Sequence, residues 1–191
     1  MVKIAILHEG NAKNTNDNGL LKLLIQELNL DIDKVIFFGM ARKSNFFKLD
    51  NKNYIQLQKD IEREAFNKIL FVVDADYEKN DEKYNGYENT ENELKNIIDK
   101  LKFTNYSDIY ITCDPKTKDG YLESLILSTI PKKHKKCIKK FLKCSEFASK
   151  DHHKSILNQI YKIAYPQKPY DFSHENFNPL KQKLINLFNE N

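Results

Sequence analysis

The chain has 191 residues, of which 31 are basic and 27 acidic, so its formal net charge is +4. A chain of this length is expected to form a domain with a true core that buries about 70% of the unfolded surface. The mixed charge permits nucleic-acid binding without arguing for it. The longest apolar runs fall far short of the roughly 20 residues that cross a bilayer, which argues against a membrane-spanning protein.

The cysteines point to a reducing compartment. Cys113, Cys137 and Cys144 form an odd set without the paired spacing of a zinc site. Cys113 follows an apolar segment and is expected to be buried rather than nucleophilic. No signal peptide precedes the first apolar segment, so we expect a cytoplasmic protein with no membrane partner.

Strand and helix patterns alternate through the first two thirds of the chain. Strands are expected at 2–8, 34–38, 68–73 and 108–113, and helices at 18–29, 54–66, 89–102 and 119–130. Asp17 or Asn18 is the expected N-cap of the first helix. Such alternation is typical of an α/β fold with a central, mostly parallel four-stranded sheet, flanking helices and right-handed crossovers. We expect this core to occupy residues 1–130.

After Pro131 the pattern changes to helices alone. These are expected at 132–147, 151–164 and 177–189, with an extended link at 166–169. Pro179 suits the first turn of the last helix. We expect residues 131–191 to form a C-terminal helical extension packed on the core, so that the chain is a single globular unit.

Two of the expected strands end in acidic residues. The unbroken apolar run 69–73 is typical of a parallel strand buried on both faces, and it leads directly into Asp74 and Asp76. The first strand leads into His8 and Glu9, and strand alternation turns His8 to the opposite face. Parallel α/β sheets bind ligands just beyond the carboxyl ends of their strands, which is where these acids are expected.

Three carboxylates at one edge repel each other unless they share a cation. Mg²⁺ is the usual partner of hard oxygen ligands, with Mn²⁺ as a substitute. Glu9, Asp74 and Asp76 are therefore candidate metal ligands, provided that their strands are neighbours in the sheet. The alternative is that the acids simply terminate strands, since aspartate is common in turns and helix caps.

The same residues resemble a known family. A glutamate and glycine after the first strand, here Glu9 and Gly10, followed later by Asp-x-Asp after an apolar strand, are similar to the Toprim core of topoisomerases, primases and several nucleases. The resemblance covers about residues 2–130. It implies that Glu9 is the catalytic acid/base and that Asp74 and Asp76 bind Mg²⁺. The segment 119–123 also resembles a Gly-x-Leu-Glu feature of small stand-alone Toprim-like proteins.

The chain departs from the family pattern after Gly10. Many Toprim nucleases carry another acid three residues after the first glutamate, whereas a longer polar turn follows here. Asp17 or Glu123 could substitute for that acid, although Asp17 is equally suited to capping a helix. Asp114, after the fourth strand, is a further accessory candidate.

A basic segment follows Pro131. Its lysines are candidate phosphate contacts that would make binding to DNA or RNA salt-dependent: Lys132, Lys133, Lys135 and Lys136. The alternative is a solvated helix face. Within this segment Cys137, Ile138, Phe141 and Leu142 can face inward.

The leading hypothesis is Mg²⁺-dependent phosphodiester hydrolysis on nucleic acid, with Glu9 moving a proton. The chain has room neither for the second, tyrosine-bearing domain of a topoisomerase nor for the template modules of a primase. A non-catalytic binding module for nucleic acid or a protein partner is the alternative, because an acid near Gly10 is missing. A sugar-nucleotide transferase could also use Asp-x-Asp with Mn²⁺, but it gives Glu9 no role. Dinucleotide-binding and P-loop motifs are absent.

Overall fold

The computed structural model describes residues 3–11, 16–78, 81, 83–145, 156–157, 159–161, 163 and 170–189. Its centre is a four-stranded sheet in the order β2-β1-β3-β4, with every pairing parallel. The strands are β1 (Lys3–His8), β2 (Val35–Gly39), β3 (Phe66–Asp74) and β4 (Ser107–Thr112). The expected α/β fold class, with a four-stranded parallel sheet and flanking helices, is confirmed.

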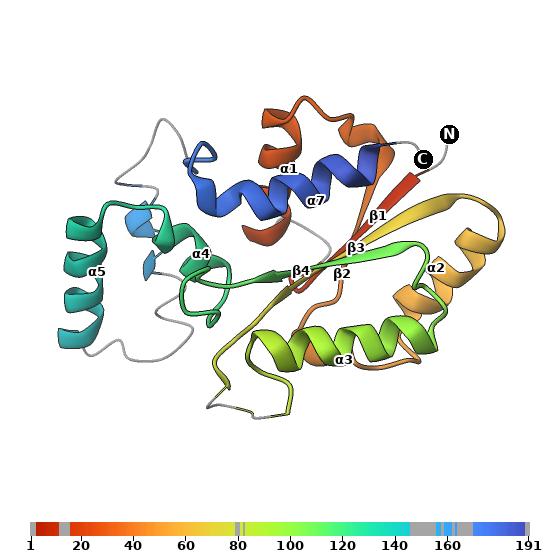
Figure 1. Cartoon of the computed structure of the whole chain (residues 1–191), viewed down its shortest axis with the longest axis horizontal. Coiled ribbons are helices and arrows are strands. Elements are labelled where there is room, and N and C mark those ends of the chain that lie inside the picture. Colours follow the sequence, from red (N-terminus) through yellow and green to blue (C-terminus); the bar gives the residue numbers. More distant parts are fainter. Residues whose placement is uncertain are drawn as a thin grey trace.

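Helices connect the strands and continue after the last one. They are α1 (Asn16–Glu27), α2 (Lys52–Glu62), α3 (Tyr87–Lys100), α4 (Leu122–Ser128), α5 (Lys132–Cys144) and α7 (Asn178–Phe188). Short 3-10 turns are η1 (Ile32–Lys34), η2 (Lys43–Asn45) and η4 (Glu175–Phe177). Figure 1 shows α1 and α7 on one side of the sheet and α2 and α3 on the other.

The three crossover helices end earlier than the sequence pattern suggests. Asn29, Glu64 and Lys102 have positive φ angles of 54°, 56° and 60°. In each case this residue and the next donate backbone hydrogen bonds back into the last turn, which closes a Schellman motif. Glycine usually marks that position, and none stands there. The N-cap expectation for α1 was wrong, because the helix begins at Asn16 and Asp17 lies within its first turn.

Alternation along the strands divides the core into two layers. Ile4 and Ile6 of β1 belong to a cluster with α1, α4 and α7, whereas Ala5 and Leu7 belong to a cluster with α2 and α3. The central strands are therefore apolar on both faces, as expected for a parallel sheet covered by helices on each side. Burial of these two layers holds the strand ends in place.

The order of strand addition reverses once along the chain. β2 is added on one side of β1, and the chain then crosses β1 to place β3 and β4 on the other side. Because crossovers are right-handed, this reversal puts α1 on one face and α2 and α3 on the other. The adjacent ends of β1 and β3 form the topological switch point, where open α/β sheets bind ligands.

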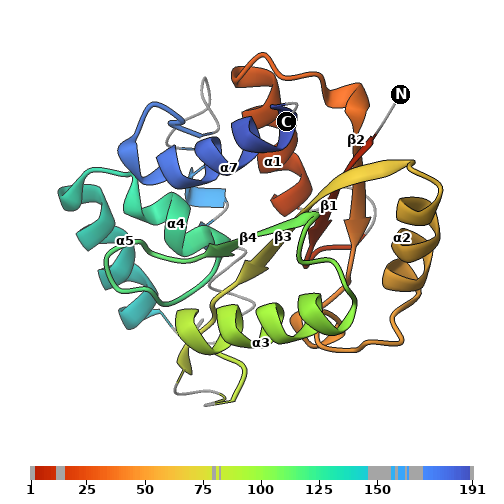
Figure 2. The ribbon, with the colours of Figure 1, turned by 45° about the vertical axis from the view of Figure 1, so that its right-hand side comes forward.

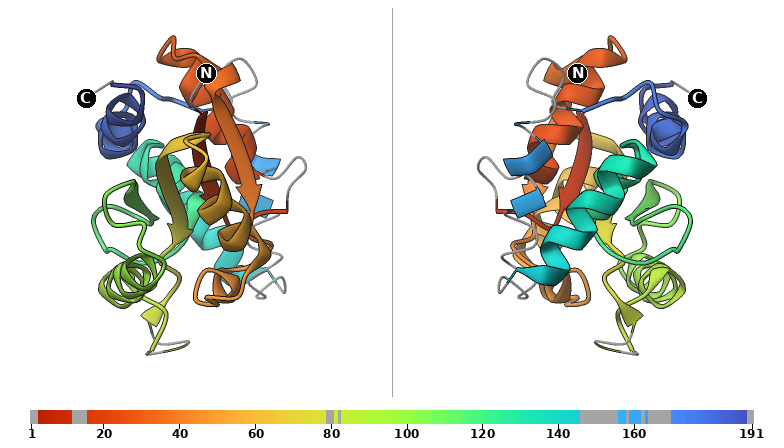
Figure 3. Two further views of the ribbon diagram at one scale, coloured as in Figure 1. Left: turned by 90° about the vertical axis from the view of Figure 1, so that its right-hand side faces the viewer. Right: turned by 90° about the vertical axis from the view of Figure 1, so that its left-hand side faces the viewer.

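The C-terminal helices differ in how they pack. α7 buries Leu180, Leu184 and Leu187 on the sheet, and its proline lies in the first turn as expected. α5 buries only Leu142 among its described residues, and Phe141 is 47% exposed, so fewer side chains of this helix face inward than predicted. Figure 3 shows α5 at the end of the molecule opposite α2.

Part of the C-terminal prediction lies outside the described residues. Positions 156–157, 159–161 and 163 are helical, in agreement with a helix over 151–164, whereas the expected link at 166–169 is not described. Cys113 is 5% exposed, and burial raises the pKa of its thiol to about 11, as expected for an inert cysteine. No helix in the described part of the chain is long and apolar enough to cross a membrane.

His8 makes the stability of the fold depend on pH. Its side chain is fully buried and contacts the Phe37 ring, which belongs to the apolar cluster on the α1 side of the sheet. Burial, together with the positive charge of Lys22, lowers the pKa of His8 from 6.5 to about 4. Between these two pH values the unfolded chain binds a proton that the folded chain does not, so acidification favours unfolding.

We therefore expect the free energy of unfolding to fall by roughly 3 kcal/mol at most from this group as the pH drops from 6.5 to about 4. His8→Leu should flatten that part of the profile, as measured by urea denaturation at a series of pH values. An unchanged slope in the variant would show that His8 is not the titrating group.

Candidate functional site

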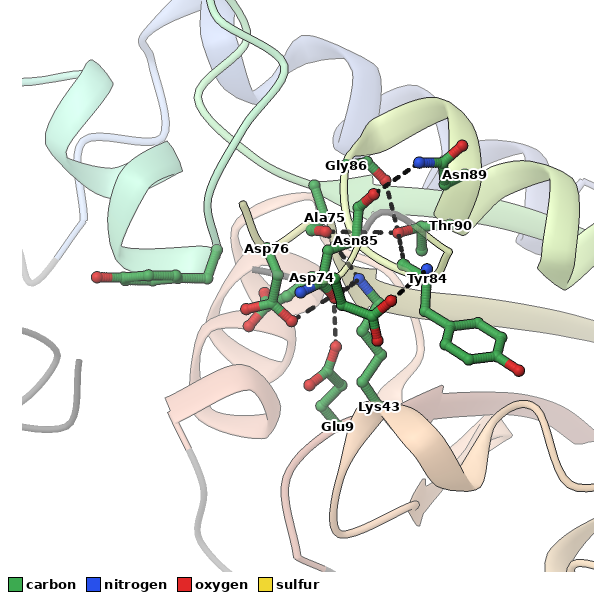
Figure 4. A network of polar contacts seen from close by, with 12 residues as sticks. Glu9, Lys43, Asp74, Ala75, Asp76, Tyr84, Asn85, Gly86, Asn89 and Thr90 are labelled. Carbon is green, nitrogen blue, oxygen red and sulfur yellow. Dashed lines mark hydrogen bonds and ion pairs between the residues drawn. The ribbon is translucent and has the colours of Figure 1, made fainter. Parts of the chain in front are cut away.

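The pairing of β1 with β3 brings Glu9 next to Asp74. His8 lies in register with Val72 at the end of this pairing. One residue further, Glu9 Oε1 accepts a hydrogen bond of 2.8 Å from the backbone N–H of Asp74 (Figure 4). The condition that the two acidic strands are neighbours is thus met, and residues 65 positions apart meet at the switch point.

Asp74 and Asp76 are both bonded to the short segment that leads into α4, one through its side chain and the other through its backbone. Asp74 Oδ1 accepts a hydrogen bond of 3.0 Å from the backbone N–H of Leu122, at the start of α4. Asp76 has a φ of 58°, a left-handed conformation that aspartate tolerates better than most residues. Its backbone exchanges hydrogen bonds of 2.6 and 3.0 Å with Gly120. The end of β3 is thereby tied to the loop that precedes α4.

The carbonyl of Ala75, between the two aspartates, accepts several hydrogen bonds from distant parts of the chain. It accepts hydrogen bonds from Lys43 Nζ at 2.7 Å, from the Gly86 N–H at 2.9 Å and from Thr90 Oγ1 at 3.4 Å. These donors come from the loop after β2 and from the start of α3. They fix the peptide that carries both acids, so the site is positioned by long-range contacts (Figure 4).

Lys43 is a site residue that the sequence analysis missed. It lies in η2, is 9% exposed, and its Nζ also lies 3.3 Å from Asn85 Oδ1 and 3.7 Å from Asp76 Oδ2. A lysine in a polar loop after a strand is normally solvated, so no local signal marks it as buried. The structure thus places a positive charge at the acidic edge.

The three acidic residues have the chemistry to bind a divalent cation, but their side chains are not arranged around a common point. Glu9, Asp74 and Asp76 offer hard oxygen ligands from adjacent strands. Within the described residues, however, no group of three or more His, Cys, Asp or Glu side chains has the geometry to hold a metal ion. To bind at this edge, a metal ion would have to replace some of the hydrogen bonds and ion pairs that these carboxylates make within the protein.

The accessory candidates lie around this edge. The carbonyl of Gly10 accepts a hydrogen bond of 3.2 Å from Ala41, which ties the loop after β1 to the loop after β2. Asp17, in the first turn of α1, lines a small cavity together with residues of β3 and β4. Glu123 is buried in α4. Burial raises the pKa of Tyr170, and the negative charges of Glu123 and Asp17 raise it further, so both acids act on the α1 side of the sheet.

Asp114 has a structural role. Its Oδ1 accepts a hydrogen bond from Lys116 N–H at 3.0 Å, and its Oδ2 accepts one from Lys135 Nζ at 2.9 Å. Burial alone would raise the pKa of Asp114, but the Lys135 ammonium and the Lys116 amide lower it overall. This ion pair docks α5 against the loop after β4.

The candidate phosphate contacts on α5 therefore differ in their surroundings. Lys132, Lys133 and Lys136 are exposed, whereas Lys135 is partly buried in its ion pair with Asp114. Figure 2 shows α4 and α5 beyond the end of β4, whose last residue, Thr112, pairs with Asp74. The exposed lysines thus belong to the same end of the sheet as Asp74.

Gly120 offers a test of how the Asp76 turn is held. It has a φ of +97°, and a Cβ there would lie 2.2 Å from Ser124 Oγ. Gly120→Ala should therefore lower the free energy of unfolding by at least about 1–2 kcal/mol. Gly19→Ala is the matched control, because a Cβ at Gly19 meets nothing within 4 Å and alanine should stabilise α1 by up to about 1 kcal/mol. Chemical denaturation would measure the free energy of unfolding of both variants, and equal values would contradict the role of Gly120 in holding the Asp76 turn.

Comparisons of this chain with protein-family models, with curated proteins and with solved structures found no match. The resemblance to the Toprim core therefore depends on the residues named above and on their placement at the switch point.

Proposed function

We propose that the protein hydrolyses phosphodiester bonds of DNA or RNA with the help of Mg²⁺, as a stand-alone Toprim-like nuclease. The observation that supports this proposal is the 2.8 Å contact between the Glu9 carboxylate and the Asp74 backbone, at the switch point of the sheet. It joins the two motifs on which the resemblance rests. The donor chemistry of the three carboxylates suits a hard cation.

The roles of the residues follow from their positions. Asp74 and Asp76 would hold the metal ion, and Glu9, fixed by its bond to Asp74, would move a proton to or from an oxygen of the scissile phosphate or water. When bound, Mg²⁺ would supply polarisation of a phosphate oxygen and neutralisation of developing charge. No covalent side-chain nucleophile is required.

The surroundings of the site support a polyanionic substrate. The loop after β4 begins near Asp114, which forms an ion pair with Lys135 of α5, and it reaches Gly120, which is bonded to Asp76. The exposed lysines of α5 extend from this point. A nucleic-acid backbone that follows them would be directed towards the acidic edge, with phosphate contacts supplying affinity.

Isosteric variants of the acids should separate chemistry from folding. In Glu9→Gln and Asp74→Asn the remaining side-chain oxygen can still accept the hydrogen bonds from Asp74 N–H and Leu122 N–H, so both variants should fold. Each should lose cleavage of labelled DNA or RNA in Mg²⁺ or Mn²⁺ by at least about 100-fold, the scale of lost acid–base catalysis.

Asp108→Asn serves as the control for these variants. Asp108 lies in β4 near its start, at the opposite end of the sheet from the acidic edge, and the variant should cleave like the wild type. Equal cleavage by wild type and the Asp74→Asn protein, or no metal-dependent cleavage by any of them, would overturn the nuclease proposal.

A non-catalytic binding module is the second candidate. The ion pair between Lys43 and Asp76 favours it, because a lysine that compensates an acidic cluster removes part of the need for a metal ion. In this case nucleic acid would bind without turnover, and Asp74→Asn would bind with wild-type affinity.

The α5 lysines give the binding prediction. Substituting Lys132, Lys133 and Lys136 together by glutamine should reduce the magnitude of the slope of log affinity against log salt by about 2 to 3, because each lost phosphate contact contributes about 0.7–0.9. A matched triple variant at the exposed Lys48, Lys52 and Lys59, next to or in α2, should keep the wild-type slope. Fluorescence anisotropy at several salt concentrations measures both, and equal slopes would contradict a role for α5.

A further inference from the structure

The ammonium group of Lys43 lies beside Asp76, one of the three carboxylates for which a divalent cation was expected. Its Nζ is 3.7 Å from Asp76 Oδ2, and it donates to the carbonyl of Ala75 between the two aspartates. The side chains of Lys43 and Asp76 are each 10% exposed, so water screens this pair only weakly. A cation is thus already present at the edge, supplied by the chain itself.

We propose that Lys43 is a built-in counter-ion that a divalent metal must displace from Asp76, so that the lysine and the metal occupy the acidic edge alternately. This inference rests on the proposed function, since it concerns how the same site is controlled. It assigns to Lys43 a positioning role: the lysine keeps the acidic turn assembled while no metal is bound.

Distance and charge make the two cations mutually exclusive. A metal bound to Asp76 Oδ2 lies about 2.1 Å from that oxygen, hence within about 6 Å of an ammonium that stays at 3.7 Å. Like charges at this separation in a buried site repel strongly, because little water lies between them. Departure of the lysine side chain removes this repulsion and uncovers the Asp76 carboxylate.

The backbone around Lys43 can keep its place when the side chain leaves. The Lys43 carbonyl accepts a hydrogen bond of 2.9 Å from the Phe46 N–H. Phe46 is fully buried, and its own carbonyl accepts a hydrogen bond of 2.8 Å from the Tyr54 hydroxyl. The Ala75 carbonyl retains the Gly86 amide and Thr90 hydroxyl as donors. A swing of the side chain alone is therefore sufficient.

Metal titration of a charge-free variant tests the inference. Lys43→Met keeps the unbranched chain and removes the ammonium, so its affinity for Mn²⁺, followed by electron paramagnetic resonance or calorimetry, should rise at least about tenfold over wild type. Loss of a merely structural lysine would lower or preserve the affinity. Lys183→Met is the control, since Lys183 forms an ion pair with Asp108, near the start of β4, and should leave Mn²⁺ binding unchanged.

A measurement on the wild-type protein makes the test independent of how the variant folds. Acetylation by an amine-reactive reagent, read by peptide mass spectrometry, should label buried Lys43 slowly without metal and several times faster with saturating Mn²⁺. Labelling of Lys183 should not change. The expected rise reports that the side chain has left its pocket.

The outcomes separate this inference from the function on which it rests. Tighter Mn²⁺ binding by Lys43→Met, or faster labelling of Lys43 in Mn²⁺, supports displacement. If wild type binds Mn²⁺ and Asp76→Asn abolishes binding, while Lys43→Met binds no tighter and labelling is unchanged, displacement is overturned and the metal site stands. If neither wild type nor Lys43→Met binds Mn²⁺, both proposals are overturned.

Discussion

The hydrogen-bonded pairing of β1 with β3 is the constraint on which the candidate site depends. Glu9 and Asp74 are 65 residues apart, and only this parallel pairing, continued by the bond from the Asp74 amide to Glu9 Oε1, brings them together. The pairing is in turn maintained by two apolar layers, because both strands are buried on each face. Any change that shifts the register of these strands would therefore move the acids apart.

Electrostatic compensation is the second requirement at this edge. Carboxylates that gather at one partly buried edge need donors or cations close by, and the protein supplies them from three segments. Leu122 donates to Asp74, the Asp74 amide donates to Glu9, and Lys43 pairs with Asp76. This arrangement stabilises the acids in the folded chain, and the proposed metal ion would have to replace contacts that already exist.

The loop after β4 couples the site to the basic helix. Gly120 bridges Asp76 at one end of this loop, and Asp114 at the other end pairs with Lys135 of α5. Strand end, loop and helix are thus joined through short polar contacts rather than through a large apolar interface, since α5 buries only Leu142 among its described residues. The position of the exposed lysines relative to the acids follows from these contacts.

The fold class and the end of the sheet at which the acids stand could be predicted without the structure, because apolar runs and helical periodicity are local and repeat along the chain. The four strands appear within two residues of their expected places, whereas the crossover helices end early because non-glycine residues such as Glu64 adopt the left-handed conformation. The folded arrangement alone gives Asp74 and Asp76 different partners and buries Lys43 against Asp76 and Asn85. A lysine in a polar loop has no local signal of burial, since the partners of Lys43 come from the segment just after β3 and from the loop just before α3, which only the folded chain brings to it.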